Sequence, residues 1–390
     1  MRKCIIFIIA AAFIAVSVMP AMAQDDKSVA ISGWVTQNTA WISQDKEWID
    51  AKKGTLPVVA PSTDDATNLD WGLSGPTSFI DFRLKQGPVS GHVRVRAGGE
   101  LGGNVAHLYG TWDFGMGQLI VGNAPVPTNR PAALVTWFPA GGYGAIDFQS
   151  RAKGIQGKFP VGPGTLWVAL LEPVNDEAGW SNSANALITE TMFPKVSANY
   201  DFKFSNFNFT VLGGYQTFNR SDSVTGSDES VDSYLLGLYG SWAMGPFTAN
   251  LNVYTMQNPN EWADVNPAGF GSTRLGHVGD FATGSSYDVD HWGWHIGIAY
   301  TLSDRVRFTG GYGWAEWSRD NPAFGTVAAA DITDEQSTYY IGAQITLYRN
   351  VIMYIPIRVS DLSNYEDTIA GIDQDEGKET RFGLRWRIRF

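Results

Sequence analysis

The chain ends in Phe382-Gly-Leu-Arg-Trp-Arg-Ile-Arg-Phe390, a stretch in which apolar and basic side chains alternate. Successive side chains of a β-strand point to opposite faces of the sheet. One face of this strand would therefore carry only apolar side chains, namely Phe382, Leu384, Trp386, Ile388 and Phe390. The other face would carry Arg381, Arg385, Arg387 and Arg389. A face suited to lipid opposite a face suited to water predicts a strand of a membrane-spanning β-barrel.

The first residues have the pattern of a secretory signal peptide. Arg2 and Lys3 precede an apolar run over residues 5–18, and Ala21-Met-Ala23 offers the small side chains that signal peptidase requires. We expect a signal peptide over residues 1–23, export through the inner membrane, and a mature chain over residues 24–390. Cys4 is the single cysteine, so the mature chain would have no disulfide and no thiolate metal or redox site.

The composition narrows the class of membrane protein. After the signal segment, glycine or a polar residue interrupts every apolar stretch before it reaches the about 18 residues of a membrane helix. The chain contains 43 Gly, 15 Trp, 15 Tyr and 21 Phe, and only 17% of its residues are charged. Without Arg2 and Lys3 the 28 basic residues become 26, so the mature charge is 26 minus 39, or −13. A helical membrane protein is excluded, and nucleic acid is disfavoured as a partner.

Short and long connections alternate along the chain. The short ones lie at residues 86–88, 115–117, 161–163, 205–206, 245–246, 303–304 and 349–350, and each contains Gly, Pro, Asn or Asp. The long ones cover residues 43–67, 98–103, 123–150, 174–186, 219–230, 258–287, 318–334 and 362–377. Between them, segments with period-two patterning predict sixteen strands, with short periplasmic turns and long outer loops.

An even number of antiparallel strands can close into a barrel that leaves no unpaired backbone edge in the membrane. Sixteen strands enclose a water-filled lumen unless a loop enters it. The predicted fold is therefore an all-β, 16-stranded antiparallel transmembrane β-barrel over residues 24–390. Aromatic residues such as Trp34, Trp41, Trp292 and Trp386 would form two girdles at the membrane surfaces. The alternative is a soluble β-protein in which the same aromatic residues fill a core.

The stretch Tyr109–Gly122 holds two short strand patterns joined by Gly115-Met-Gly117, and the segment after it contains Trp137-Phe-Pro-Ala-Gly-Gly-Tyr143. Both resemble the trimeric general porins of Gram-negative bacteria, in which a third outer loop with proline and glycine folds into the channel. The ending Leu384, Trp386, Ile388 and Phe390 resembles the assembly signal of outer-membrane proteins. The resemblance covers the whole mature chain. It implies a constriction loop over residues 123–150 and a homotrimer in the cell outer membrane.

The constriction loop departs from the porin pattern in its charge. Porins usually carry acidic residues on this loop, opposite arginines of the wall. Here Ala140 and Tyr143 stand near the position of those acids, and Asp147 is the only acid between residues 123 and 150, with Arg130 as a base. The loop would therefore contribute little negative charge to the narrowest part of the channel.

Basic side chains fall in the inward register of several strands and would line the lumen. They are Arg83, Lys85, His92, Arg94, Arg96, Arg305, Arg307, Arg358, Arg381 and Arg385. Few acids share that register, Asp81 and Asp113 among them. Fixed positive charge lowers the free energy of passing anions and raises that of cations. We expect a water-filled channel for passive diffusion of small hydrophilic solutes and ions, with a weak preference for anions.

Most acids gather instead in the long connections, as at residues 45–50, 64–65, 222–229 and 366–376. They would be solvated, or they would bind divalent cations shared with lipopolysaccharide phosphates. No spacing among them matches a dedicated calcium loop.

Other functions remain as alternatives. A substrate-specific channel for an anion or a sugar is the main one, because stacked guanidinium groups match oxyanions. An outer-membrane enzyme is a weaker one, since His92, His107, His291 and His295 come without a serine-nucleophile or His-Glu-x-x-His motif. An adhesin or a sheath around a cytochrome has no supporting motif. We expect no cofactor. The expected partners are outer-membrane lipid and lipopolysaccharide, the barrel-assembly machinery and further copies of the chain.

Overall fold

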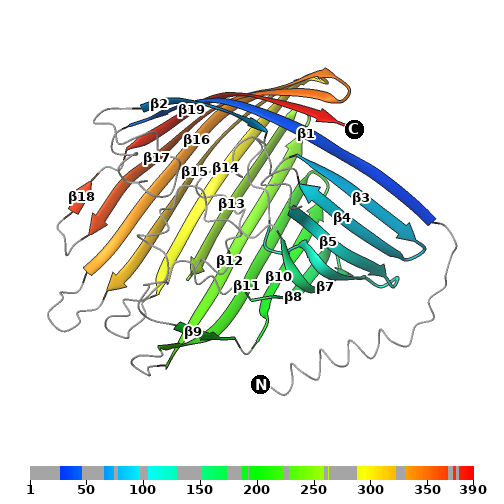
Figure 1. Cartoon of the computed structure of the whole chain (residues 1–390), viewed down its shortest axis with the longest axis horizontal. Coiled ribbons are helices and arrows are strands. Elements are labelled where there is room, and N and C mark those ends of the chain that lie inside the picture. Colours follow the sequence, from blue (N-terminus) through cyan, green and yellow to red (C-terminus); the bar gives the residue numbers. More distant parts are fainter. Residues whose placement is uncertain are drawn as a thin grey trace.

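The computed structural model is one antiparallel sheet that curves until its first and last strands pair (Figure 1). It describes residues 27–45, 66–73, 78–96, 104–129, 151–173, 187–191, 193–222, 228–258, 262, 288–321, 330–367, 372–374 and 377–390. The predicted signal peptide, residues 1–23, lies outside the described residues. No helix among the described residues is long and apolar enough to cross a membrane.

The strands in the first part of the chain are β1 (Lys27–Gln44), β2 (Ala66–Leu73), β3 (Phe79–Gln86), β4 (Val89–Arg96), β5 (Asn104–Asp113), β6 (Gln118–Pro125), β7 (Arg151–Val161), β8 (Gly164–Leu171) and β9 (Leu187–Glu190). The next are β10 (Lys195–Phe204), β11 (Phe207–Asp222), β12 (Asp228–Met244), β13 (Phe247–Gln257), β14 (Val289–Ser303), β15 (Val306–Asn321), β16 (Ala330–Tyr348), β17 (Val351–Asp367), β18 (Ile372–Gln374) and β19 (Lys378–Arg389).

These segments form a closed barrel of sixteen strands, as predicted. Three barrel strands are interrupted and therefore carry two labels each. β2 and β3 pair with successive halves of β1, β9 and β10 pair with successive parts of β11, and β18 and β19 pair with successive parts of β17. β1 pairs with β19 from Trp34↔Arg389 to Gln44↔Glu379, which closes the sheet and removes its edges.

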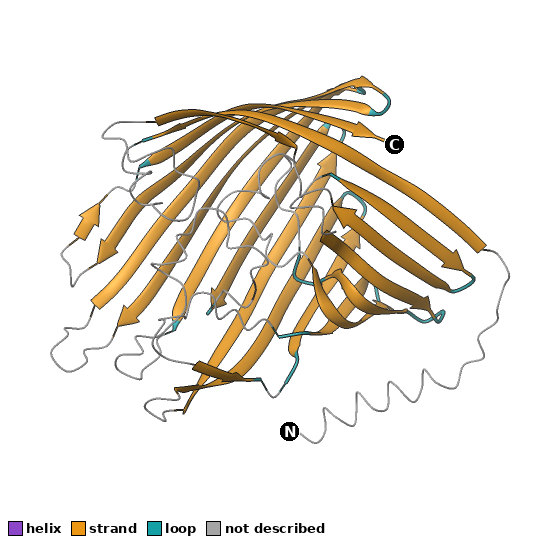
Figure 2. Ribbon diagram, in the orientation of Figure 1, coloured by secondary structure: helices purple, strands orange, loops and turns teal. Residues whose placement is uncertain are grey.

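All seven short connections predicted from the sequence are tight reversals between neighbouring strands, and they lie at one end of the barrel, here called the turn end. The other end is called the loop end (Figure 2). Gly87, Gly162 and Gly245 in these turns have φ values of 55°, 54° and 55°, in the left-handed region that side chains disfavour. Glycine at these positions lets the chain reverse within two residues.

The wall is lower on one side than on the other. β4, β6 and β8 have 8 residues each, whereas β11, β12, β15, β16 and β17 have 16, 17, 16, 19 and 17. The extra length lies at the loop end (Figure 1). It corrects the prediction of long loops at 219–230, 318–334 and 362–377. Pairing continues to Ser221↔Asp228, Asn321↔Ala330 and Asp367↔Ile372, so the described residues of these segments extend the barrel strands.

Side chains alternate between an apolar outer face and a polar inner face. Val29, Ile80, Val211, Leu236 and Ile341 are exposed on the outer face, among many similar residues. Trp41 stacks on Phe382 there, with ring centroids 5.6 Å apart. Trp34 does not belong to this face, and its predicted place in a girdle is wrong. It lies on the inner face, where its ring is 4.4 Å from that of Phe79.

Candidate functional site

The inner wall of the barrel is the candidate site, because it carries the polar and charged side chains that a lumen would present to solutes. Nine of the predicted pore-lining residues are on strands, in the inward register: Arg83 and Lys85 on β3, His92, Arg94 and Arg96 on β4, Arg307 on β15, Arg358 on β17, and Arg381 and Arg385 on β19. The structure brings five of them into two clusters, each around one carboxylate.

The first cluster surrounds Asp81 on β3. Arg94 donates from Nε and Nη2 to both carboxylate oxygens, at 2.7 and 2.8 Å. His92 Nε2 lies 3.0 Å from Asp81 Oδ1, and its Nδ1 lies 3.0 Å from the Tyr109 hydroxyl. The Arg83 guanidinium approaches the same carboxylate at 3.9 Å. One buried acid thus compensates part of the basic charge of β3 and β4.

The second cluster surrounds Glu379 on β19, which the sequence analysis did not identify. Its side chain is fully buried. Arg381 donates from Nη2 to Glu379 Oε2 at 2.8 Å, and Arg358 Nη2 lies 3.1 Å from Oε1. Gln44 on β1 donates to Oε2 at 2.7 Å. The carboxylate therefore ties β1, β17 and β19 together, and it offsets the charge of two arginines that were predicted to face solutes.

A row of alternating cations and aromatic rings crosses the inner wall between these clusters. The Arg94 guanidinium carbon lies 3.7 Å from the Phe79 ring centroid, and Phe79 packs on Trp34. Arg387 lies 4.6 Å from the Trp34 centroid and 5.3 Å from that of Tyr354. The row, called here the cation–aromatic row, therefore runs from β4 through β3, β1 and β19 to β17.

The cation–aromatic row holds positive charge without neutralising it. Aromatic faces attract a guanidinium through their quadrupole but carry no net charge. Arg387 and Arg389 form no ion pair within the part of the chain that the structure describes. Arg387 is 5% exposed, and its hydrogen bond to the Tyr354 hydroxyl is 3.4 Å long. These two arginines therefore contribute uncompensated positive charge to the inner wall.

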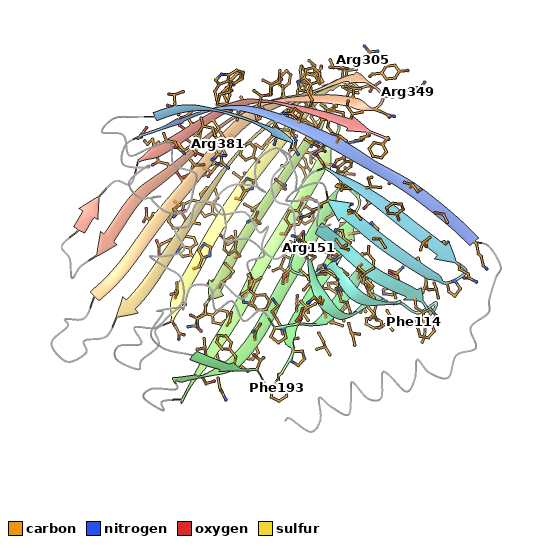
Figure 3. All side chains as sticks on the ribbon, in the orientation of Figure 1. Phe114, Arg151, Phe193, Arg305, Arg349 and Arg381 are labelled. Carbon is orange, nitrogen blue, oxygen red and sulfur yellow. The ribbon has the colours of Figure 1, made fainter. Side chains whose placement is uncertain are left out.

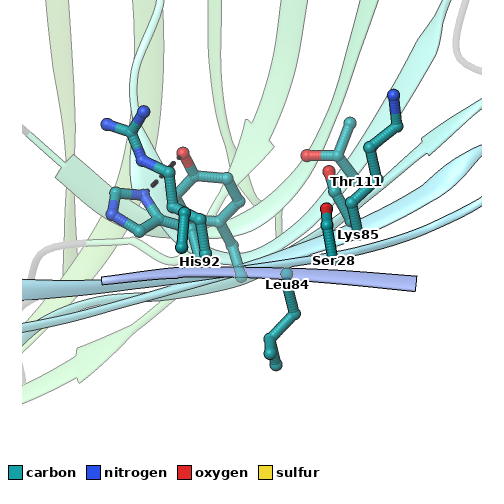
Figure 4. A pocket seen from close by; sticks show the side chains of 10 residues that line it. Ser28, Leu84, Lys85, His92 and Thr111 are labelled. Atoms are coloured by element: carbon teal, nitrogen blue, oxygen red, sulfur yellow. Dashed lines mark hydrogen bonds between the residues drawn. The ribbon is translucent and has the colours of Figure 1, made fainter. Parts of the chain in front are cut away.

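A shallow pocket opens on the same wall near the turn end. It has a volume of about 480 Å³ and is lined by residues of β1, β3, β4 and β5. Figure 4 shows Ser28, Lys85 and Thr111 on one face of these strands and Leu84 on the other, with the His92 to Tyr109 hydrogen bond drawn as a dashed line. The pocket is open to the lumen and presents an ammonium group beside hydroxyl groups.

The chain leaving β6 turns into the barrel, as the prediction of a constriction loop requires. Val126 is fully buried and packs with Ala152, Ala169 and Leu171 on the inner faces of β7 and β8. Pro127, the next residue, lies against β10, because Asn199 Nδ2 of that strand donates to Pro127 O at 2.5 Å. Val126 and Pro127 thus lie against the inner faces of β7, β8 and β10. Residues 130–150, with Arg130 and Asp147, lie outside the described residues.

Arg305 is placed differently from the prediction. It belongs to the tight turn between β14 and β15 and is exposed there. Figure 3 shows it with Arg349 at the turn end, away from Arg381. Arg305 and Arg307 are two residues apart, so the sequence pattern assigns both to the same face of a strand, but β15 begins only at Val306.

The two histidines of β14 lie on the inner wall, each beside a tyrosine. His291 Nε2 lies 3.2 Å from the Tyr254 hydroxyl, and the His295 ring stacks on Tyr340 at 5.8 Å. Within the described ranges, no three His, Cys, Asp or Glu side chains are grouped so that they could hold a metal ion.

No known sequence family and no curated protein matches the chain. Solved structures do. The chain is similar to the outer membrane channel DcaP of Acinetobacter baumannii, with a TM-score of 0.66 and 13% identity over 93% of this chain and 97% of that one. It is similar to OmpT of Vibrio cholerae in its trimer form, with a TM-score of 0.57 and 11% identity over 94% and 100%. It is also similar to the anion-selective porin from Comamonas acidovorans, with a TM-score of 0.56 and 13% identity over 94% and 100%. The chain therefore has the closed sixteen-stranded barrel fold of Gram-negative outer-membrane porins.

Proposed function

We propose that the protein is a porin of the cell outer membrane, through which small hydrophilic solutes and ions diffuse passively, with a weak preference for anions. The apolar outer face and polar inner face support the location and the channel. The similar structures described as channels and porins support the same class.

The uncompensated charge of the inner wall carries the proposal of anion preference. Asp81 and Glu379 offset the cations around them, whereas Arg387 and Arg389 contact aromatic rings rather than carboxylates. Anions passing this part of the wall gain Coulomb energy, and cations lose it. The preference is weak because the two acids remove much of the positive charge that the sequence places on the wall.

Reversal potentials of the refolded protein in planar bilayers, measured under a salt gradient, test the proposal. We expect a reversal potential with the sign of anion selectivity, reduced in Arg387→Gln and in Arg389→Gln. Clear cation selectivity of the native protein would contradict the anion preference, and the absence of any conductance would contradict the channel itself.

A substrate-specific channel for an organic anion is the second candidate, and the cation–aromatic row is the observation that favours it. Guanidinium groups beside the faces of Trp34 and Phe79 offer both charge and apolar contact to a planar anion. Saturable block of conductance by a micromolar aromatic carboxylate, absent with chloride alone, would favour this function over unselective diffusion.

We also propose how the protein is exported and how it assembles in the membrane. Residues 1–23 act as the export signal, and Leu384, Trp386, Ile388 and Phe390 serve as the signal to the barrel-assembly machinery. The barrel associates as a homotrimer surrounded by outer-membrane lipid and lipopolysaccharide, and it has no catalytic activity. Migration on unboiled gels as a species that heat converts to the monomer tests the trimer.

A further inference from the structure

A second residue from an outer connection enters the lumen. Trp262 belongs to the connection between β13 and β14, which starts at the loop end of the barrel. Its side chain is nevertheless fully buried. It packs in a cluster with Leu212, Leu235, Tyr254 and Met256, which are inward-facing residues of β11, β12 and β13. The indole therefore lies against the inner wall rather than outside the barrel.

The inner wall is shaped to receive this indole. Gly214 of β11 lies directly beneath it: a Cβ atom at this position would be 2.3 Å from Trp262 Cη2. The indole Nε1 donates to Ser233 Oγ of β12 at 2.9 Å. Lys195 Nζ of β10 lies 5.0 Å from the ring centroid on another side. A missing side chain, a hydrogen bond and a cation together fix one orientation of the ring.

The chain leaves β13 at a low point of the barrel rim. β13 ends at Gln257, opposite Tyr234, so residues 228–233 of β12 rise above it and pair with β11 only. At this point Asn258 adopts a φ of 50°, a left-handed value that asparagine tolerates better than most residues. Its side chain donates to Asp232 O at 2.7 Å and to Asp288 Oδ1 at 2.8 Å. The reversal at Asn258 is thus held from both sides, four residues before Trp262.

Two chain segments therefore meet the same strand from inside. Pro127 contacts Asn199 of β10, and Trp262 contacts Lys195 of β10, four residues along the same inward face. We propose that Trp262 is a second constriction residue, which fills part of the lumen over β10–β13 and helps to set the size limit for solutes. This inference rests on the proposed channel function and assigns a specificity-determining role to a side chain outside the predicted constriction loop.

Single-channel conductance and the uptake of sugars of increasing size into liposomes test the proposal. Trp262→Ala empties the space of the indole, so conductance should rise roughly 1.5-fold and larger sugars should enter, because both follow the open cross-section of the pore. Gly214→Ala should act in the opposite direction and lower the conductance and the sugar cut-off, since its Cβ would push the ring away from β11 toward the lumen. Trp262→Phe keeps a ring over Gly214 and should stay close to the native values.

The matched control is Gly240→Ala on β12, where the nearest atom to a new Cβ is a ring carbon of Phe207 at 3.7 Å. It changes a strand glycine without touching Trp262, and it should keep the native conductance. Heat-modifiable migration on gels verifies that each variant has folded. If the Trp262→Ala and Gly214→Ala barrels fold and both keep the native conductance and sugar cut-off, the proposal is wrong. If Trp262→Ala does not fold, the conductance of Gly214→Ala alone tests the proposal.

Thiol labelling gives a readout that does not depend on conductance. Leu235→Cys places a thiol on a fully buried inward position beneath Trp262. A hydrophilic maleimide should label it slowly, and several-fold faster when Trp262→Ala is added. Equal rates would show that Trp262 does not cover the wall. A native barrel that passes no ions would instead overturn the proposed function, and the labelling result would still decide the placement of Trp262.

Discussion

Glu379 determines how much positive charge the wall presents at the level of Arg358 and Arg381. Its carboxylate is fully buried and bonded to both arginines and to Gln44. Glu379→Gln removes the negative charge and keeps the shape, so two guanidinium groups lose their compensation. We expect the ratio of anion to cation permeability to rise roughly 1.5- to 2-fold. Reversal potentials under a salt gradient measure this change.

The control for this variant is Glu172→Gln. Glu172 pairs with Lys153 at 2.9 Å, and the two side chains are 54% and 71% exposed. Because this ion pair is exposed to solvent, its loss should change the electric field in the lumen only slightly. The permeability ratio should therefore stay at the native value. An unchanged ratio in Glu379→Gln as well would mean that this part of the wall does not act on passing ions.

We expect Asp81 to stabilise the fold through its two hydrogen bonds with Arg94. Asp81→Asn replaces one charge-assisted hydrogen bond by a weaker one and leaves an Arg94 donor without its acceptor. We expect the free energy of unfolding to fall by about 1–3 kcal/mol, since a partly buried charged donor loses its partner. The midpoint of urea unfolding measures the loss. A native midpoint would show that His92 and solvent satisfy Arg94 equally well.

The alternation of side chains along a strand is sufficient to place Glu379 and Trp34 on the inner face. Glu379 stands two residues before Arg381, so the alternation that points Arg381 inward also points Glu379 inward. Trp34 and Trp41 are seven residues apart, and one regular strand cannot place both on its outer face. The cation–aromatic row was beyond prediction, because it depends on the register of five strands, and register is fixed by turns and closure rather than by local pattern.

The seam between β1 and β19 is the element on which closure depends. Gly33 N donates to Phe390 O, and Phe390 N donates to Gly33 O, both at 3.0 Å. A Cβ on Gly33 would lie 2.3 Å from Phe79 O and 2.9 Å from a ring carbon of Phe390. Gly33→Val should therefore prevent closure and abolish the compact, heat-modifiable species on gels. Gly91→Val is the matched control, since its Cβ meets only Leu84 at 3.9 Å, and it should fold.

The strands were predicted well near the turns and poorly at the loop end. Gly, Pro, Asn and Asp at two-residue reversals leave a strong local signal, as at Gly87 and Gly162. Toward the loop end the sequence loses its period-two pattern although backbone pairing continues, as at Asn321↔Ala330. A sequence pattern reports the environment of side chains, and it cannot report pairing where both faces are wet.

The whole molecule combines a net negative charge with a basic inner wall. The chain carries a formal charge of −11, yet Arg387, Arg389, Lys85 and Arg307 lie on the inner wall without an ion pair to a described residue. The sign of the total charge therefore does not describe the charge of the inner wall. Selectivity follows the charges nearest the ion path, because charges farther away than a Debye length are screened.

Ionic strength should consequently control selectivity. The Debye length falls from about 10 Å at 0.1 M salt to about 3 Å at 1 M, so fixed charges on a wide wall lose their influence on ions near the axis. We expect the anion preference to decline from dilute to concentrated salt. Reversal potentials at the same concentration ratio but different mean concentrations measure it. The double variant Arg387→Gln and Arg389→Gln should show little dependence on salt.

The opposite result would be equally informative about mechanism. A preference that persists at 1 M salt requires anions to contact the wall directly, since only contacts shorter than about 3 Å escape screening there. The groups positioned for such contact are Arg387 and Arg389 beside Trp34. Persistence in the native protein, together with its loss in the double variant, would therefore shift the function from unselective diffusion to a substrate-specific anion channel built on the cation–aromatic row.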